Sequence, residues 1–91
     1  MALTTHLFRY VDDKVRARGS SYFRNGSVDI IHGNKEELQA LVFGTDTYEV
    51  EIFRLEDAVH VACTCPFFEG ERVCCKHIWA ALLAAESKGY L

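Results

Sequence analysis

Two closely spaced pairs of metal-binding side chains constrain this sequence more than any other feature. The first pair is Cys63 and Cys65, and the second ends at His77, which follows two adjacent cysteines, Cys74 and Cys75. Side chains at positions i and i+2 of an extended strand point to the same side. Cys63 and Cys65 can therefore bind one metal ion together.

The second pair lies at the start of a predicted helix. Apolar residues recur at helical spacing from Ile78 to Ala85, which predicts a helix from about Cys75 to Ser87. A pair on a strand and a pair on a helix can approach one ion from different directions. Three thiolates and one imidazole favour tetrahedral Zn²⁺. Spacing alone leaves Cys74 as an alternative to Cys75 for the third sulfur.

The length of the chain fits one domain. It has 91 residues, of which 49% are hydrophobic, and a chain of this size buries only a little over ~60% of its unfolded surface. We expect a single domain over residues 1–91, with a helix and a sheet in 1–62 and a zinc finger with the final helix in 63–91. Bound zinc should supply much of its stability, and chelation should unfold residues 63–91.

The cysteine content and the N-terminus bear on the cellular location. Residues 1–6 lack the pattern of a secretion signal, and no apolar run approaches the ~20 residues of a membrane helix. We therefore expect an intracellular protein in the reducing cytoplasm, without membrane partners. In that compartment four cysteines indicate metal ligands, whereas secretion would favour disulfides.

The sequence before the cysteines predicts one helix and about four strands. Asp12 or Asp13 can cap a helix that ends near Asn25-Gly26. Apolar and polar residues then alternate in four segments, at about 28–32, 38–43, 48–53 and 59–65, separated by turns that include Glu56-Asp57. The segment from Leu7 to Val11 fits either a short helix or a strand.

Short connections between these strands favour an antiparallel meander. The expected fold class is α+β, with an N-terminal helix, a small antiparallel meander of about four strands and a zinc-anchored C-terminal helix. The residues between the two ligand pairs are expected to form a loop.

Charge is distributed unevenly along the chain. Residues 1–26 carry five basic and two acidic groups, for +3, and residues 27–62 carry two basic and eight acidic groups, for −6. Residues 63–91 balance at three each, so the total is −3. This distribution disfavours a protein that neutralises many phosphates. If nucleic acid is bound, the candidate contacts are Arg16, Arg18, Arg24, Arg72 and Lys76.

The residues around both ligand pairs resemble the SWIM zinc finger. Cys63-Thr64-Cys65-Pro66 and Cys75-Lys76-His77-Ile78 are similar to its Cys-x-Cys and Cys-x-His motifs, which flank a short loop before an apolar helix. Upstream, Arg18-Gly19, Tyr22, Gly26-Ser27-Val28 and Tyr48-Glu49-Val50 are similar to the region before the finger in bacterial proteins, many of them associated with Swi/Snf-type helicases.

The resemblance implies a zinc-binding module that contacts DNA or protein partners. It carries the ligands over to Cys63, Cys65, Cys75 and His77, and thereby selects Cys75 over Cys74. Four protein ligands leave no open position for a reacting water, so one structural zinc ion and no enzymatic activity are expected. No small-molecule substrate is expected either.

Three functions compete. The first is a protein-interaction module, attached to or partnering a helicase or another nucleic-acid enzyme, which the acidic middle of the chain favours. The second is a nucleic-acid-binding zinc finger, which the resemblance supports and the net charge opposes. The third is a thiol redox protein that uses Cys63 and Cys65, which zinc binding disfavours because it occupies both sulfurs.

Overall fold

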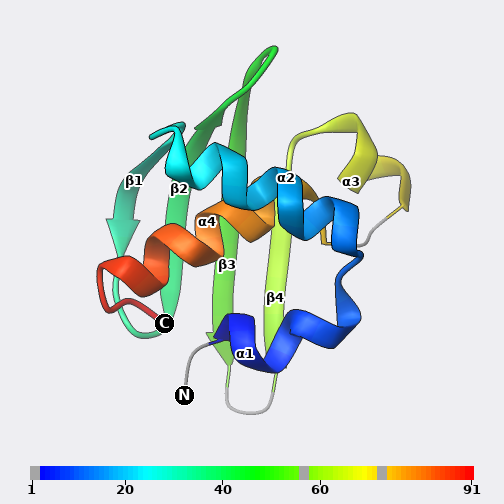
Figure 1. The fold of residues 1–91 in the computed structure, drawn as a ribbon. Coiled ribbons are helices and arrows are strands. Elements are labelled where there is room, and N and C mark those ends of the chain that lie inside the picture. The colour runs from blue at the N-terminus through cyan, green and yellow to red at the C-terminus, as the bar shows by residue number, and fades with distance from the viewer. Residues whose placement is uncertain (1–2, 56–57, 72–73) are drawn as a thin grey trace.

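The described residues form helices and strands in the order α-α-β-β-β-β-α-α. Figure 1 shows the computed structural model, which describes residues 3–55, 58–71 and 74–91. The elements are α1 (Leu3–Leu7), the 3₁₀ helix η1 (Phe8–Tyr10), α2 (Asp13–Arg24), β1 (Val28–Gly33), β2 (Glu37–Phe43), β3 (Thr47–Leu55), β4 (Ala58–Cys63), α3 (Pro66–Glu71) and α4 (Lys76–Ser87).

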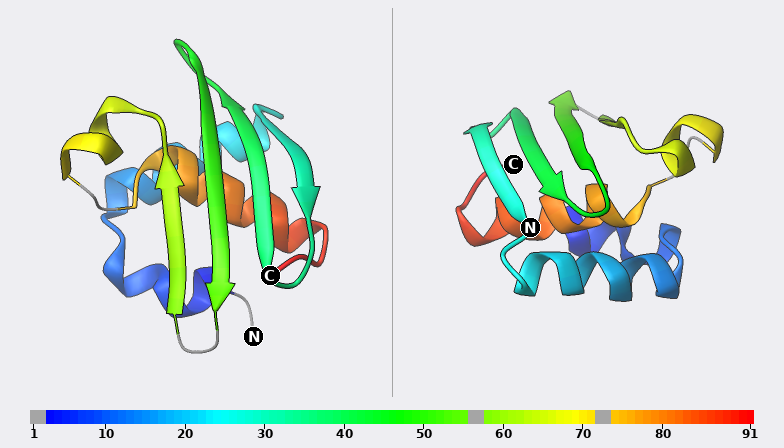
Figure 2. Two further views of the ribbon diagram at one scale, coloured as in Figure 1. Left: turned by 180° about the vertical axis from the view of Figure 1, so that it is seen from behind. Right: turned by 90° about the horizontal axis from the view of Figure 1, so that it is seen from above.

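The elements are arranged in three layers. The strands form one antiparallel sheet in the order β1-β2-β3-β4. Helix α4 lies against one face of this sheet, and α2 packs on the far side of α4 (Figure 2). Within the part of the chain that the structure describes, no helix covers the opposite face of the sheet. The predicted α+β fold, with its antiparallel meander and terminal helices, is confirmed.

The core lies between the sheet and α4 and follows from the alternation of the strands. Leu38 and Val42 of β2 and Ile52 of β3 are fully buried, whereas Glu49 and Glu51 on the other face of β3 are exposed. The exposed face of the sheet therefore carries acidic side chains on β3. On the helix side, α4 is buried along most of its length, at His77, Ile78, Trp79, Ala80, Ala81, Leu82, Ala84 and Ala85.

Helix α2 has the limits that its sequence predicts. Asp12 is the N-cap, and its carboxylate accepts a hydrogen bond of 2.9 Å from the backbone N–H of Lys14. The helix ends at Arg24, and Gly26 follows with a φ of +72°, a conformation that glycine adopts without strain. The undecided segment from Leu7 to Val11 is helical, since α1 ends at Leu7 and η1 follows it.

The structure differs from the predictions around the cysteines. Strand β4 ends at Cys63, so Cys65 lies beyond the strand, and the predicted loop contains helix α3. Pro66 occupies the first position of this helix, where its lack of an N–H group has no cost. The backbone carbonyl of Cys65 accepts from the N–H of Glu69 at 3.1 Å. The predicted turn at Glu56-Asp57 lies outside the described residues.

None of the helices in the described ranges is sufficiently long and apolar to pass through a bilayer.

The contact between α2 and α4 depends on Gly19. A Cβ atom at this position would lie 2.8 Å from the backbone carbonyl oxygen of Lys76 and 2.8 Å from Cβ of Trp79. Contacts this short require the two helices to separate. The absence of a side chain at Gly19 therefore sets the distance between α2 and the start of α4.

We expect Gly19→Ala to destabilise the zinc-loaded protein by about 1–3 kcal/mol, because overpacking outweighs the gain of about 1 kcal/mol in helix propensity. Gly70→Ala is the matched control, since Gly70 lies in α3 and nothing lies within 4 Å of an added Cβ there. That control should be neutral or stabilising. Urea denaturation followed by circular dichroism measures both, and equal stabilities would refute this account of the α2–α4 contact.

Candidate metal centre

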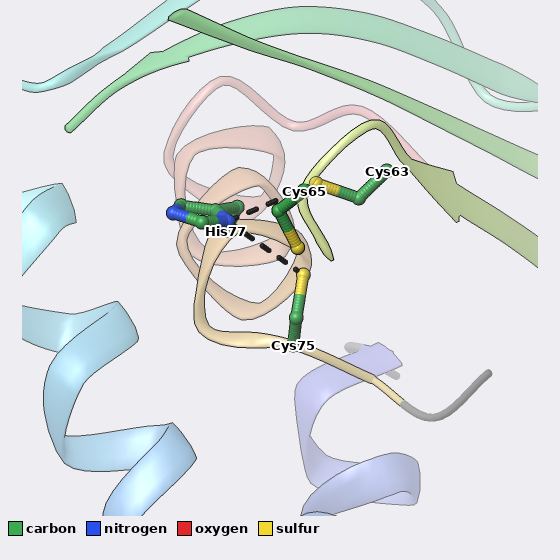
Figure 3. Close-up of side chains that lie close together, drawn as sticks. All are labelled: Cys63, Cys65, Cys75 and His77. Atoms are coloured by element: carbon green, nitrogen blue, oxygen red, sulfur yellow. Dashed lines mark hydrogen bonds between the residues drawn. The ribbon is translucent and has the colours of Figure 1, made fainter. Parts of the chain in front are cut away.

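Four donor side chains from three places in the chain meet at one end of α4. Cys63 is the last residue of β4, and Cys65 precedes α3. Cys75 is the N-cap of α4, and His77 lies in its first turn. Figure 3 shows the three sulfur atoms and the imidazole pointing toward one another.

The geometry of this group fits a tetrahedral zinc ion. Nδ1 of His77 lies 3.8 Å from Sγ of Cys63 and 3.9 Å from Sγ of Cys75. One donor atom from each of the four residues lies within 4.8 Å of all the others. Zn–S bonds of about 2.3 Å and Zn–N bonds of about 2.0 Å would place ligand atoms about 3.5–3.8 Å apart in a tetrahedron. The four residues can therefore hold one zinc ion with small adjustments.

All four donors are buried, with exposed fractions of 1–5%. Backbone contacts hold the segment between the first two cysteines. The N–H of Thr64 donates to the carbonyl of Glu49 at 3.1 Å, and its hydroxyl accepts from the N–H of Glu49 at 3.0 Å. Sγ of Cys65 accepts from the backbone N–H of Phe68 at 3.4 Å. The chain is thus fixed on both sides of Cys65.

Two tyrosines contact the imidazole of His77. The ring of Tyr48 stacks on it with centroids 4.2 Å apart, and Tyr22 meets it edge-on at 5.3 Å. Nδ1 faces the sulfur atoms, while Nε2 points away from them (Figure 3) and has no hydrogen-bond partner among the described residues. Coordination through Nδ1 would leave the ring proton on Nε2. Neither tyrosine was predicted from the sequence to lie at the site.

Cys74 lies outside the group. Its side chain is half-buried, and its thiol donates to the carbonyl oxygen of Cys75 at 3.7 Å. The four donors brought together are those that the resemblance selects, with Cys75 and without Cys74.

Comparison with known proteins agrees with this geometry. The family model of the SWIM zinc finger matches residues 44–86, a segment that includes all four donors. The chain contains a SWIM zinc finger. An uncharacterised protein of Methanocaldococcus jannaschii is 34% identical over 80 residues, which cover 88% of this chain and 32% of that protein. The chain thus spans about a third of the length of this relative. No solved structure matches the chain.

The thiols of the SWIM finger have unequal pKa values without metal. The pKa of Cys75 is lowered to about 4, chiefly by a hydrogen bond from the Cys63 side chain, with a further contribution from His77. The same hydrogen bond raises the pKa of Cys63 far above its ordinary range, and burial raises that of Cys65. Burial also raises the pKa of Cys74 to about 12. Without metal the four-donor group therefore holds one thiolate, on Cys75, and two thiols, on Cys63 and Cys65.

The basic candidates for nucleic-acid contact lie in different surroundings. The guanidinium of Arg16 donates to the carbonyls of Phe8 and Val11, lies 3.6 Å from the Phe8 ring centroid and pairs with Asp13. These contacts hold the Arg16 guanidinium against its own chain, so it is not free to contact a phosphate.

The other basic candidates have fewer contacts. Arg18 and Arg24 are exposed on α2, Lys76 is half-buried at the start of α4, and Arg72 lies outside the described residues. Lys14, which was not a candidate, lines the same cavity as Arg18 and Lys76.

Replacing Cys75 should remove zinc, whereas replacing its neighbour should not. We expect Cys75→Ser to lower zinc affinity by at least about 100-fold, the upper end of what changes outside the ligand shell produce. It should also unfold residues 63–91, as chelation should. Cys74→Ser is the matched control and should retain one zinc ion. Native mass spectrometry and competition with a chromophoric chelator measure both, and zinc loss only in Cys74→Ser would reverse the ligand assignment.

Zinc binding at pH 7 should release about two protons from the thiols, because Cys63 and Cys65 are protonated in the metal-free group and Cys75 is not. The bound state holds fewer protons, so the apparent zinc affinity should rise with pH. Calorimetry in two buffers of different ionisation enthalpy gives the proton count. An affinity independent of pH between 6 and 8 would contradict the assignment of two thiols.

Proposed function

We propose that this chain is an interaction module with a structural zinc ion, and that it contacts a protein partner. The observation that carries the proposal is the closed donor set. Cys63, Cys65, Cys75 and His77 supply four ligands, the number of a structural zinc site, and all four are buried. A reacting water would need an open coordination position, so the arrangement supports a role in folding rather than in catalysis.

The ion would stabilise a surface rather than a reaction site. It would join the end of β4, the segment before α3 and the first turn of α4. Helix α3, which lies between the ligand pairs, would then present a fixed surface. A partner protein can recognise such a surface without ordering it on binding, and that lowers the entropic cost of association.

The charge of the molecule supports a protein partner over nucleic acid. The chain carries a net charge of −3, and the open face of the sheet presents Glu49 and Glu51. Arg16, one of the basic candidates, is occupied by contacts within the chain. Arg16 is therefore not available for phosphate contacts.

The length of the relative supports a modular role. In the Methanocaldococcus jannaschii protein, the matching segment is about a third of a longer polypeptide. A helicase-type machine as partner, or as the remainder of a longer protein, follows from the SWIM resemblance, because many related fingers are associated with Swi/Snf-type helicases. A domain of this kind takes its biological role from the protein to which it is joined.

A nucleic-acid-binding zinc finger is the second candidate. One observation favours it: Lys14, Arg18 and Lys76 line one cavity together with the exposed aromatic ring of Phe67. Cations beside an exposed aromatic ring are typical of surfaces that bind single-stranded nucleic acid.

The two candidates are separated by titrating the zinc-loaded chain with labelled single-stranded DNA, duplex DNA and RNA at about 50 mM and about 200 mM salt. We expect no saturable binding at either salt concentration. Binding at low salt that weakens steeply at high salt would establish the second candidate instead.

The protein partner is then identified by cross-linking in cells and mass spectrometry. We expect the cross-links to persist in Cys74→Ser and to disappear in Cys75→Ser, since only the second loses zinc. Cross-links that survive the loss of zinc would contradict a role for the finger in the interaction.

A further inference from the structure

We propose that a cavity beside the metal centre binds an acidic peptide segment that carries an apolar side chain. This deepens the proposed function and depends on it, since it names the surface and the chemistry of the protein partner. The cavity has a volume of about 190 Å³ and lies between the first half of α2, the segment from Cys65 to Phe67 and the start of α4. Three of the four donors, Cys65, Cys75 and His77, form part of its wall together with Tyr48, so the cavity opens directly onto the metal centre.

Three cations line this cavity. Lys14 and Arg18 are four residues apart on α2, so their side chains lie on the same side of the helix. Lys76 joins them from the first position of α4. Within residues 3–55, 58–71 and 74–91, none of the three forms an ion pair. Arg16 and Asp13 on the same helix pair with each other instead.

The charge of the metal centre does not neutralise this group of cations. A zinc ion with three thiolates and a neutral imidazole carries a net charge of −1. Three cations beside that centre leave a surplus of about two positive charges. On a molecule with a net charge of −3, this surplus marks a local surface that attracts carboxylates.

The cavity also has an apolar part. Val15, Pro66 and Phe67 contribute to its lining, and the Phe67 side chain is 48% exposed. Its neighbour Phe68 is buried in the core. The cavity has a volume of about 190 Å³. That volume suits one large apolar side chain, such as leucine.

These features favour an acidic peptide over nucleic acid. A strand of nucleic acid presents a row of phosphates and needs a basic track that follows it. Here three cations surround one small cavity, and the exposed face of the sheet carries Glu49 and Glu51. A peptide with one apolar side chain would fill the apolar part of the cavity. Carboxylates on either side of that side chain would pair with Lys14, Arg18 and Lys76.

The test titrates the zinc-loaded full chain into a fluorescein-labelled peptide in which glutamates flank a single leucine. Comparison peptides replace either the leucine with serine or the glutamates with glutamines, and a single-stranded thymidine oligonucleotide is the nucleic-acid arm. We expect saturable binding of the first peptide and about tenfold weaker binding of both comparison peptides. The oligonucleotide should show no saturable binding.

Charge reversal locates the binding surface. Arg18→Glu and Lys14→Glu should each weaken peptide binding by about tenfold, because attraction to the carboxylates becomes repulsion. Arg24→Glu is the matched control, since it makes the same charge change at an exposed site of α2 outside the cavity, and should have little effect. Phe67→Ala should also weaken binding. Zinc content and circular dichroism should be unchanged in all four variants.

Each alternative outcome overturns the inference in a distinct way. Equal losses in Arg18→Glu and Arg24→Glu would show non-specific attraction to net charge. Tighter binding of the oligonucleotide, lost in Arg18→Glu, would assign the cavity to nucleic acid. No peptide binding, while cross-links to the cellular partner persist in Arg18→Glu, would reject this cavity and leave the proposed function intact. Cross-links that survive zinc loss in Cys75→Ser would reject the proposed function itself.

Discussion

The arrangement of one end of this molecule depends on the convergence of three sulfur atoms and one imidazole. Strand β4 lies at the edge of the sheet, and α3 has only six residues, fewer than an isolated helix needs to be stable in water. Cys63 and Cys65 connect these two elements to the start of α4 through Cys75 and His77. A metal ion in this group would therefore replace core contacts that a chain of 91 residues has too little apolar surface to supply.

Most of the fold could be predicted because its signals are local. The alternation of β2 and β3 is visible in the sequence, and Asp12 and Gly26 mark the ends of α2. Helix α3 was missed although Pro66 supplies a helix-start signal, because a helix of six residues is too short to show apolar periodicity. Strand register is a long-range property. The pairing of Val50 with Cys63 brings β3 to the metal centre, and no local pattern specifies it.

The candidate site also combines features that local sequence patterns predict with features that depend on long-range packing. Spacing pointed to Cys63, Cys65 and His77 as candidate ligands, but the choice between Cys74 and Cys75 needed the SWIM resemblance. In the structure Cys75 is the N-cap of α4 and its sulfur lies with the other donors, whereas the Cys74 thiol donates to the carbonyl oxygen of Cys75. The contact of Tyr48 with His77 depends on register. The confinement of Arg16 depends on how η1 packs against α2, so its charge alone made it a candidate for nucleic-acid contact.

The proposed peptide cavity and the metal centre share residues, and this connects their energetics. Cys65, Cys75 and His77 belong to both, and the segments that carry Phe67 and Lys76 begin next to these ligands. If zinc removal unfolds residues 63–91, the cavity exists only in the zinc-bound state. Any ligand of the cavity must then raise the zinc affinity by the same factor by which zinc raises the affinity for that ligand, because coupling between two equilibrium binding sites is reciprocal. A partner protein would thus stabilise the finger as well as recognise it.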